Sequence, residues 1–255
     1  MLILPASLAL AFALYLPLPQ AAAPIARLLA RLYAPVRSAF TDRKGNTDER
    51  SAAVVFALLL CGVAAILAAL HPALAALTIA PLFTALSHVP RAAAVKRELD
   101  SGAYANDIAV YEALVSETSA SLAPVFAAEA FLPLLLCALG LALRLGGGLG
   151  WAVFGLRAAC GEDERVQRFL APLLRASDRV LFVLMLSCSF LVGRNPFRTR
   201  GDGLGARMLS VLGIAKDSTR IHPPMAGDIA QAAFLCCFCL GLLCFTLTLM
   251  LFAVL

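Results

Sequence analysis

Long uncharged apolar segments alternate with polar blocks along the whole chain. The clearest apolar segment is the last one, Ala230–Leu255, which contains no Asp, Glu, Lys or Arg. About 20 helical residues are enough to cross the hydrocarbon core of a bilayer. Helices buried in soluble proteins are usually shorter and keep a polar face. This segment therefore predicts a membrane-spanning helix.

Four further apolar segments continue this pattern. Ser51–Ser87 is too long for one crossing and has a His-Pro pair at its middle, so it predicts either two helices or a span followed by a re-entrant or interfacial segment. Val180–Gly193 is short, and either crosses with help from its flanks or lies buried among other helices. Met1–Pro19 lacks the basic start of a secretory signal and predicts a retained first helix. With Leu122–Ala142, we expect four to six membrane helices.

The charged residues lie in four blocks between these segments, at about 26–50, 88–117, 144–179 and 194–228. Only 15% of the residues are charged and 61% are hydrophobic, whereas soluble domains carry roughly 25% charged residues. The net charge of +5 comes from Lys and Arg beside membrane segments, where they act as orientation signals, and it gives no support to a nucleic-acid partner. Because the blocks are too small to fold alone, the sequence predicts one all-α, polytopic membrane domain over 1–255, with helical and irregular polar loops.

Two of the polar blocks show helical patterns. In Arg91–Val115, apolar side chains at 108, 111 and 115 follow the spacing of an amphipathic helix. Glu162–Leu174 begins with acidic residues, which complement the positive end of a helix dipole. Pro172 predicts a break or kink in that helix.

The block 194–228 has a different character. Its segment RNPFRTRGDGLGARM places three glycines among four arginines and predicts a flexible cationic loop. Glycine-rich backbone with Arg198, Arg200 and Arg207 nearby suits a phosphate or carboxylate, although the spacing matches no phosphate-binding fingerprint. The same loop also suits contact with anionic lipid, and both interpretations remain open.

Acidic residues suggest two further sites. Glu112 and Glu117, with the hydroxyls of Thr118 and Ser119, stand just before an apolar segment. Carboxylates there can hold Mg²⁺ or act as a general base, and they can equally form a solvated helix face with a cap. Glu129 alone interrupts an apolar segment, at a cost of about 3 kcal/mol on insertion scales. It predicts either a functional group partnered by an arginine of another helix or an interfacial position.

Cysteine and histidine form no recognisable motif. Of eight cysteines, only Cys160 lies in a polar block, so we expect small apolar helix residues rather than a thiolate metal site. His71 and His88 carry no recognisable context. Asp228, shortly after His222, predicts a cap or first-turn acid of the last helix.

Three segments together suggest a family. DERVQRFLAPLLRASD at 163–178 is similar, without a gap, to NERYRRFGWAAARLDD. ETSASLAPVF at 117–126 is similar to AENTVDGVIAPLFY, and HPPMAGDIAQAAFL at 222–235 is similar to the proline and Asp-Ile start of a final helix. These are segments of the CbiB/CobD family, the membrane-bound adenosylcobinamide-phosphate synthases of cobalamin biosynthesis, which the chain resembles over most of its length. Ser119 and Ser177 stand where that family has aspartates.

The resemblance implies an ATP-dependent carbon–nitrogen ligase in the cytoplasmic membrane of a bacterium or archaeon. Such an enzyme joins an activated corrin carboxylate of adenosylcobyric acid to the amine of an aminopropanol phosphate or related amino alcohol. ATP, Mg²⁺ and a corrinoid substrate are implied, and a membrane partner subunit or a second copy of the chain is compatible with it. The implied catalytic residues are Glu117, Glu164 and Asp178, with Glu117 and Asp178 as metal candidates. The implied substrate- and phosphate-binding residues are Arg165, Arg168, Arg175, Arg198, Arg200 and Arg207.

Two other classes remain open. The replaced aspartates favour a non-catalytic membrane protein, such as an AmpE-like regulatory or sensory protein or a degenerate CbiB paralogue. A small transporter or channel finds less support, because intramembrane charges are few and paired broken helices are found at most in 51–87.

Overall fold

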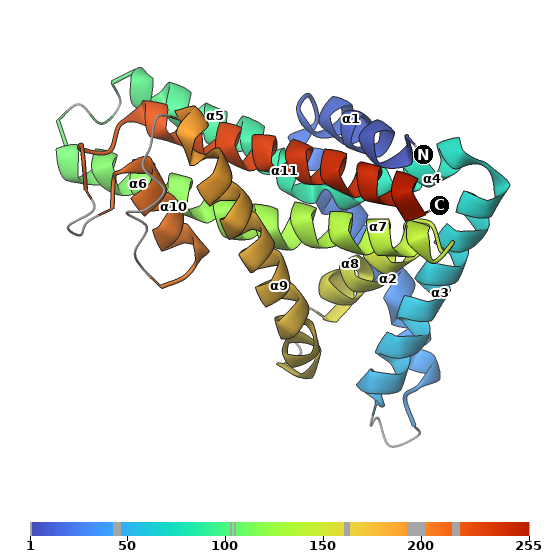
Figure 1. Ribbon diagram of the computed structural model, residues 1–255. Helices are drawn as coiled ribbons and strands as arrows, with labels where there is room; N and C mark the ends of the chain where they lie inside the picture. Colours follow the sequence, from blue (N-terminus) through green and yellow to red (C-terminus); the bar gives the residue numbers. More distant parts are fainter. Residues whose placement is uncertain are drawn as a thin grey trace.

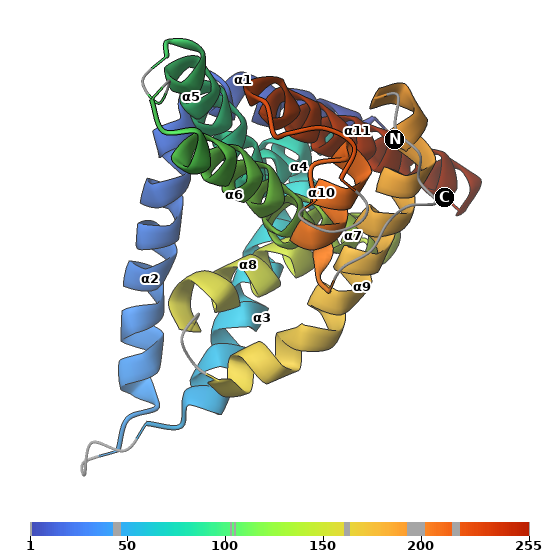
Figure 2. The same cartoon turned by 90° about the vertical axis from the view of Figure 1, so that its left-hand side faces the viewer.

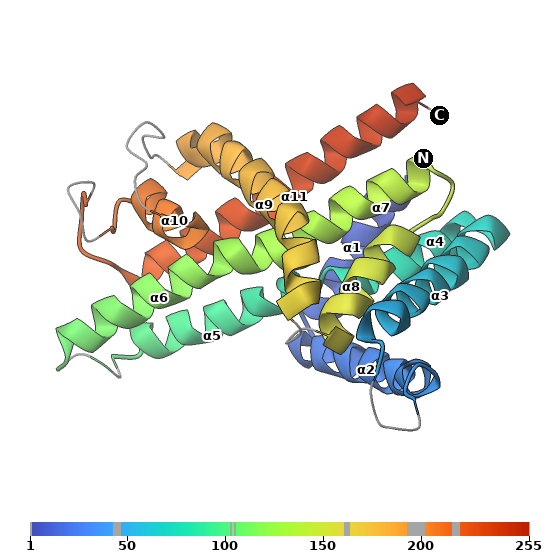
Figure 3. The same cartoon turned by 90° about the horizontal axis from the view of Figure 1, so that it is seen from below.

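The computed structural model describes residues 2–42, 47–102, 104, 106–160, 164–192, 202–215 and 220–254, without the side chains of 159–160, 164–167 and 191–192. The regular structure in this part of the chain is helical, as predicted (Figure 1). Two long rods run side by side through the molecule: α11 (Ala226–Val254), and the continuous helix of α6 (Ile108–Phe126), the π-helical turn η4 (Ala127–Phe131) and α7 (Leu132–Ala142). Figure 3 shows both rods in one view.

The shorter elements surround these rods and make most of the remaining contacts. α2 and α3 extend together toward one end of the molecule, next to α8, while α9 crosses the rods on another side (Figure 2). The bounds of these elements are α1 (Ile3–Tyr15), η1 (Pro19–Ala21), α2 (Ala22–Ala39), α3 (Glu49–Leu70), α4 (Pro72–Ile79), η2 (Ala80–Leu82), η3 (Thr84–Ser87), α5 (His88–Asp100), α8 (Gly148–Cys160), α9 (Glu164–Cys188), η5 (Ser189–Val192) and α10 (Leu204–Leu212).

Three helices among the described residues are long and apolar enough to cross a membrane: Glu49–Leu70, Ile108–Ala142 and Ala226–Val254. The number rises to five if two bent pairs each count as one span. One pair is Ile3–Tyr15 with Pro19–Ala39, bent by 107°, and the other is Pro72–Leu82 with Thr84–Asp100, bent by 54°. The range of three to five overlaps the lower part of the four to six that we predicted.

The exposed surface of these helices is apolar. On α3, Leu58 is 65% exposed and Ile66 is 63% exposed, and on α11 Phe245 is 59% exposed. Soluble monomers rarely expose contiguous apolar faces of this kind. Several apolar helices with outward-facing leucine and phenylalanine are therefore consistent with a membrane protein, and this fits the uncharged segments of the sequence.

The interior lies where the rods meet α1, α4, α5 and α9. Its largest fully buried side chains include Tyr15, Phe83, Phe126, Phe131 and Met185. The cysteines of the apolar segments that are described line this interior or its edge as free thiols, which agrees with their interpretation as small apolar residues. These side chains come from α1, the η2–η3 junction, the long helix of α6 to α7, and α9, and their burial in one cluster holds the short elements on the rods.

Close approach of α8 to α3 depends on glycine. A Cβ atom added at Gly148 would lie 2.8 Å from both the carbonyl oxygen and the Sγ of Cys61. One at Gly155 would meet the side chains of Leu60 and Phe56. Small residues at a helix interface let the two backbones approach closely and make more van der Waals contacts. These contacts matter in a bilayer, because the hydrophobic effect does not drive helices together in lipid.

Polar caps set where several helices begin. Asp48 accepts hydrogen bonds from the backbone N–H of Ser51 (3.2 Å) and from its hydroxyl (2.6 Å), and starts α3. The same bonds hold the pKa of the Asp48 carboxyl below its usual value. At the His-Pro break, His71 Nδ1 accepts from the N–H of Ala73 (3.1 Å) and starts α4. The break predicted inside 51–87 is confirmed, since two helices meet there.

Three sequence predictions need correction. Arg91–Val115 is not one helix: α5 ends at Asp100, and Gly102 adopts a left-handed φ of +82° before α6 begins. Met1–Pro19 does contain a first helix, Ile3–Tyr15, which is too short to cross a bilayer alone and reaches spanning length only together with Pro19–Ala39.

The other two corrections concern α9 and α10. α9 runs without a break through Pro172, from Glu164 to Cys188, because packing outweighs the lost backbone hydrogen bond, so the break is corrected and the kink stays a prediction. Part of the predicted cationic loop is helix α10, which fits closely on α6. A Cβ at Gly205 would lie 2.7 Å from the carbonyl oxygen of Ala120, an oxygen left without a helical partner because Pro124 has no N–H.

Candidate functional site

Five residues of the predicted set lie on α9, and the side chains of three of them are described. Arg168 and Arg175 are exposed, and Asp178 is partly buried, which raises the pKa of its carboxyl above the usual value. Ser177, next to it, is buried, and its hydroxyl donates a hydrogen bond to the backbone carbonyl of Ala127 in the π-helical turn. α9 therefore holds Asp178 beside the α6–α7 rod.

Arg207 links α10 to α9. Its guanidinium lies over the ring of Phe182, 4.4 Å from the ring centroid. A cation in this position is attracted by the negative face of the ring. Among the described residues, the Phe182 ring is the one contact of the Arg207 guanidinium that bears on anion binding. That Arg207 binds an anion therefore stays a prediction.

The other predicted residues are placed less completely. Glu117 is exposed on α6, five residues after Glu112, whose Oε1 accepts from Arg220 at 2.9 Å. Ser119 is buried, and its hydroxyl has no partner in the described structure. The side chains of Glu164 and Arg165, in the first turn of α9, and all of Arg198 and Arg200 lie outside the described residues.

Within the described residues, no three His, Cys, Asp or Glu side chains gather closely enough to hold a metal ion. Among the described residues, no third metal-binding side chain therefore joins Glu117 and Asp178, the predicted metal candidates. Where Mg²⁺ binds by few protein ligands, the substrate phosphate supplies the others.

The π-helical turn at Ala127–Phe131 forms the centre of a polar region. Leu132 N–H donates to the carbonyl of Ala127 five residues earlier, the wide spacing of a π turn. The next residue, Pro133, has no N–H, so the carbonyl of Ala128 is free to accept from Arg157 Nη1 at 2.6 Å. Two successive carbonyls of this turn thus accept hydrogen bonds, the first from Ser177 of α9 and the second from Arg157 of α8.

The same turn carries Glu129 into a cleft of about 320 Å³ between α2, η3, α5 and α8. Glu129 Oε2 accepts a hydrogen bond from Thr84 Oγ1 at 3.0 Å and lies 3.8 Å from His88 Nε2. Arg91, Arg157 and Ser87 also line the cleft. We define these six side chains as the Glu129 cleft.

Sequence reasoning found only part of this cleft. It singled out Glu129 as an ionisable group in an apolar segment, and the structure places it with Thr84 and His88, with no ion pair to an arginine among the described side chains. His88 was given no role, and Arg91 and Arg157 were not selected. A signal was present for Arg157, a lone charge in the apolar stretch 149–160. No local pattern connects 84–91 with 129 and 157.

The start of α11 confirms the prediction for Asp228. This residue lies in the first turn, is buried, and accepts from the backbone N–H of Met225 at 2.8 Å. His222 Nε2 lies 3.7 Å from its other oxygen, and the N–H of Ala226 donates to the Tyr111 hydroxyl at 2.9 Å. These contacts attach α11 to α6 and leave Asp228 a structural acid.

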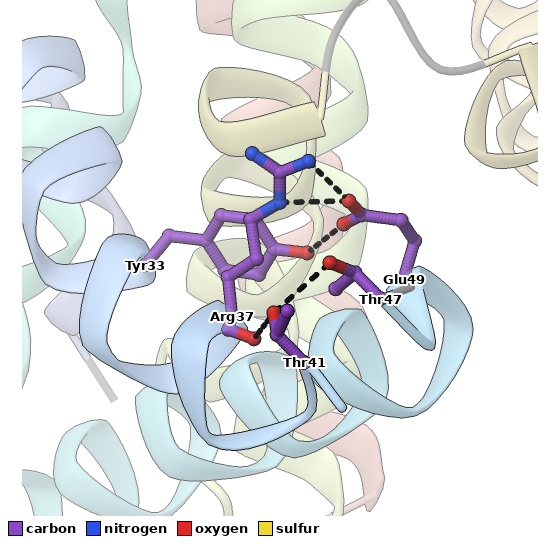
Figure 4. Close-up of polar contacts among 5 residues, drawn as sticks. All are labelled: Tyr33, Arg37, Thr41, Thr47 and Glu49. Atoms are coloured by element: carbon purple, nitrogen blue, oxygen red, sulfur yellow. Dashed lines mark hydrogen bonds and ion pairs between the residues drawn. The ribbon is translucent and has the colours of Figure 1, made fainter. Parts of the chain in front are cut away.

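A second polar cluster joins α2 to α3 at their common end (Figure 4). Arg37 Nε donates to Glu49 Oε1 at 2.7 Å, Tyr33 donates to Glu49 Oε2 at 3.0 Å, and the hydroxyls of Thr41 and Thr47 are 2.9 Å apart. The figure shows Glu49 between the two donors, and the Thr41 hydroxyl between Thr47 and the backbone carbonyl of Arg37, to which it donates at 3.0 Å. This pairing closes the connection between the helices.

We expect Arg37→Ala to change stability little. Because the Arg37 side chain is 56% exposed, solvent screens its ion pair, and the free energy of unfolding should fall by about 1 kcal/mol or less. Thermal melting in detergent measures this, with Arg27→Ala as the control at an exposed arginine of the same helix whose described hydrogen bond goes to its own turn. A loss of several kcal/mol would show that the cluster holds α2 in place.

Comparison of the chain with protein-family models, curated proteins and solved structures gives no match. The functional argument therefore depends on the residues of this chain and on their arrangement.

Proposed function

We propose that the protein is a membrane-embedded amide synthase of the CbiB/CobD type. In the reaction, a corrin carboxylate is first activated with ATP; the amine nitrogen of an amino-alcohol phosphate then attacks the activated carbonyl carbon. The new C–N bond forms as the activating group leaves with the former carboxylate oxygen, and the amine loses a proton to a base. Mg²⁺ would be held mainly by phosphate oxygens, with Asp178 and Glu117 as protein candidates.

The observation that supports this proposal is the meeting of segments that are distant in the chain. The segments on which the resemblance is based lie at the end of α6, in α9 and at the start of α11; α11 packs on both other helices, and α9 meets the π-helical turn that continues α6. Ser177 bonds to Ala127 and Arg207 covers Phe182 within this contact. Segments that form one active site must lie close together in the fold. Segments that resembled the family only by chance would not need to meet.

Asp178 is the best-placed base in this arrangement. It is partly buried next to the rod, and its pKa is raised, so it accepts a proton more readily than an exposed aspartate. The arginines of α9 and Arg207 supply positive charge on the neighbouring surface for phosphate oxygens.

A specific observation favours a second candidate, the non-catalytic membrane protein. Glu117 is exposed on α6, and among the residues described no three His, Cys, Asp or Glu side chains meet to form a metal site. In this alternative, α9 and α10 form a docking surface and Asp178 takes part in packing.

Complementation separates the two candidates. A strain that lacks its own adenosylcobinamide-phosphate synthase is supplied with cobyric acid as the only corrinoid, and we expect the wild-type chain to restore growth. Asp178→Asn should reduce formation of the amide product by about 10²-fold or more, the usual effect of removing a general base. The matched control is Asp100→Asn, at an acid of α5 that pairs with Lys96 away from this region.

The product is measured by mass spectrometry of extracted corrinoids, with membrane expression of each variant checked by immunoblot. Absence of rescue by wild-type protein present at normal levels in the membrane would refute the synthase and favour the regulatory alternative. Equal product from Asp178→Asn and wild type would remove Asp178 from the mechanism.

A further inference from the structure

The Glu129 cleft contains two arginines without an acidic partner. Neither Arg91 nor Arg157 forms an ion pair with a carboxylate in the part of the chain that is described. Arg157 uses one N–H on the carbonyl of Ala128, and Arg91 reaches the carbonyl of Pro19 only at 3.5 Å. A guanidinium carries five N–H donors, so most donors of both remain available to a ligand.

Ser87 provides an independent observation. It is 1% exposed, it lines the cleft, and its hydroxyl has no hydrogen-bond partner among the described groups. Buried polar atoms are nearly always paired, because an unpaired one loses its hydration without compensation. Because this oxygen is itself closed to solvent, a group in the cleft supplies the missing partner once the Ser87 hydroxyl rotates toward it.

The donors come from different sides of the cleft. Arg91 belongs to α5, Arg157 to α8 and Ser87 to η3, while α2 contributes only the small side chains of Ala22, Ala23 and Ala26. Phosphate has oxygens in tetrahedral directions and can accept from several elements at once, whereas a planar carboxylate is best matched by one fork of donors.

Glu129 is the acceptor in this otherwise donor-rich cleft. Its carboxylate is held by Thr84 and lies near His88, so its charge offsets one of the two guanidinium charges and leaves an excess of positive charge. It would exclude a ligand that offers only negative oxygens at that position, and it would accept from a ligand hydroxyl or ammonium group.

We propose that the Glu129 cleft binds a phosphate-bearing group, contacted by Arg91, Arg157 and the hydroxyl of Ser87. The volume of about 320 Å³ fits a phosphate with a short substituent. This group belongs either to a phospholipid head or to a soluble phosphate ester, since both present the same oxygens. The inference is based on the residues of the cleft and is independent of the proposed synthase activity.

The test uses the full-length protein in a neutral detergent. Its melting temperature is followed as potassium phosphate is added, against potassium chloride of equal ionic strength, and tryptophan fluorescence of Trp151 gives a second measure of binding. In the lipid arm, the protein is incubated with phosphatidylcholine vesicles with or without 20% phosphatidic acid (about one lipid in five, enough to populate a headgroup site).

Arg91→Ala and Ser87→Ala are the informative variants. Because Arg91 is exposed and Ser87 has no partner to lose, both should fold, and each should weaken the response at least about tenfold, as expected when a charged or buried hydrogen bond is removed. The matched control is Arg97→Ala, an exposed arginine of the same helix whose described hydrogen bond goes to Ala93 and which lies outside the cleft.

Each outcome decides the proposal. If free phosphate stabilises the wild type and Arg97→Ala, and Arg91→Ala and Ser87→Ala lose this stabilisation, the result supports a soluble phosphate ester. If the same pattern is seen only with phosphatidic acid, the result supports a lipid head. No response of the wild type in either arm overturns the proposal, as does an equal loss in Arg97→Ala, which would indicate nonspecific surface charge. Because corrin chemistry is absent from this test, its failure leaves the synthase proposal unaffected.

Discussion

Gly148→Leu is expected to lower the melting temperature of the protein strongly. The new side chain would begin with a Cβ only 2.8 Å from the carbonyl oxygen of Cys61 on α3, and this backbone oxygen cannot move without shifting the helix. Overpacking of this kind costs about 1–3 kcal/mol when the backbone can adjust. We expect the upper end of this range or a larger loss, because the added leucine has no space between α3 and α8.

The control is the same exchange at Gly62. This glycine lies on α3 one residue after Cys61, and an added Cβ would meet no atom within 4 Å. Gly62→Leu should therefore leave the melting temperature nearly unchanged or raise it slightly, since leucine is a better helix former than glycine. Thermal unfolding in one detergent compares the two variants, and equal melting temperatures would mean that α8 does not pack on α3 at this distance.

Leu58→Lys should strongly reduce recovery of the protein from membranes. Leu58 is 65% exposed near the middle of the candidate span Glu49–Leu70. If water surrounded α3, lysine at such a position would cost almost nothing. In a bilayer, a lysine at the centre of a helix costs about 2.5–3.5 kcal/mol on insertion scales. The amount of full-length protein that stays in the membrane fraction after an alkaline wash measures this difference.

The matched control is Leu28→Lys on α2. Leu28 is 56% exposed, and it lies between Arg27 and Arg31, next to charges already present. We expect this exchange to change recovery little, because α2 tolerates cations on that face. If the two lysine variants were recovered equally, with the wild type soluble in buffer without detergent, α3 would be a surface helix in water and the membrane assignment would be wrong.

The sequence predicted the large-scale architecture well because that architecture depends on the hydrophobic pattern alone. The uncharged segment of α11 and the His-Pro break at His71 both appear where expected. The break between α5 and α6 was missed, since the spacing of Ile108, Tyr111 and Val115 describes α6 only and the pattern was extended backward across Gly102. Periodicity shows which residues share a face and is a poor guide to where a helix begins.

The Glu129 cleft could not be predicted because it is formed by tertiary contacts. Glu129 was identifiable as a charge in an apolar segment, but Arg157 enters the cleft through the packing of α8, and His88 through the bend between η2 and η3. The carbonyl that Arg157 contacts is free because of Pro133, a consequence that appears only once the turn is known to be π-helical. Local patterns do not contain this information.

The wide turn at Ala127–Phe131 also affects how this chain can tolerate changes in length. A π turn corresponds to one extra residue in an otherwise regular helix. Deleting a single residue there would restore regular α-helical winding and leave α7 facing nearly the same way relative to α6. The same deletion in the regular helix on either side would rotate everything downstream by about 100°, and the face of α7 that now contacts α8 and α11 would turn away from both. Within this long helix, a one-residue deletion should therefore preserve the packing best in this one turn.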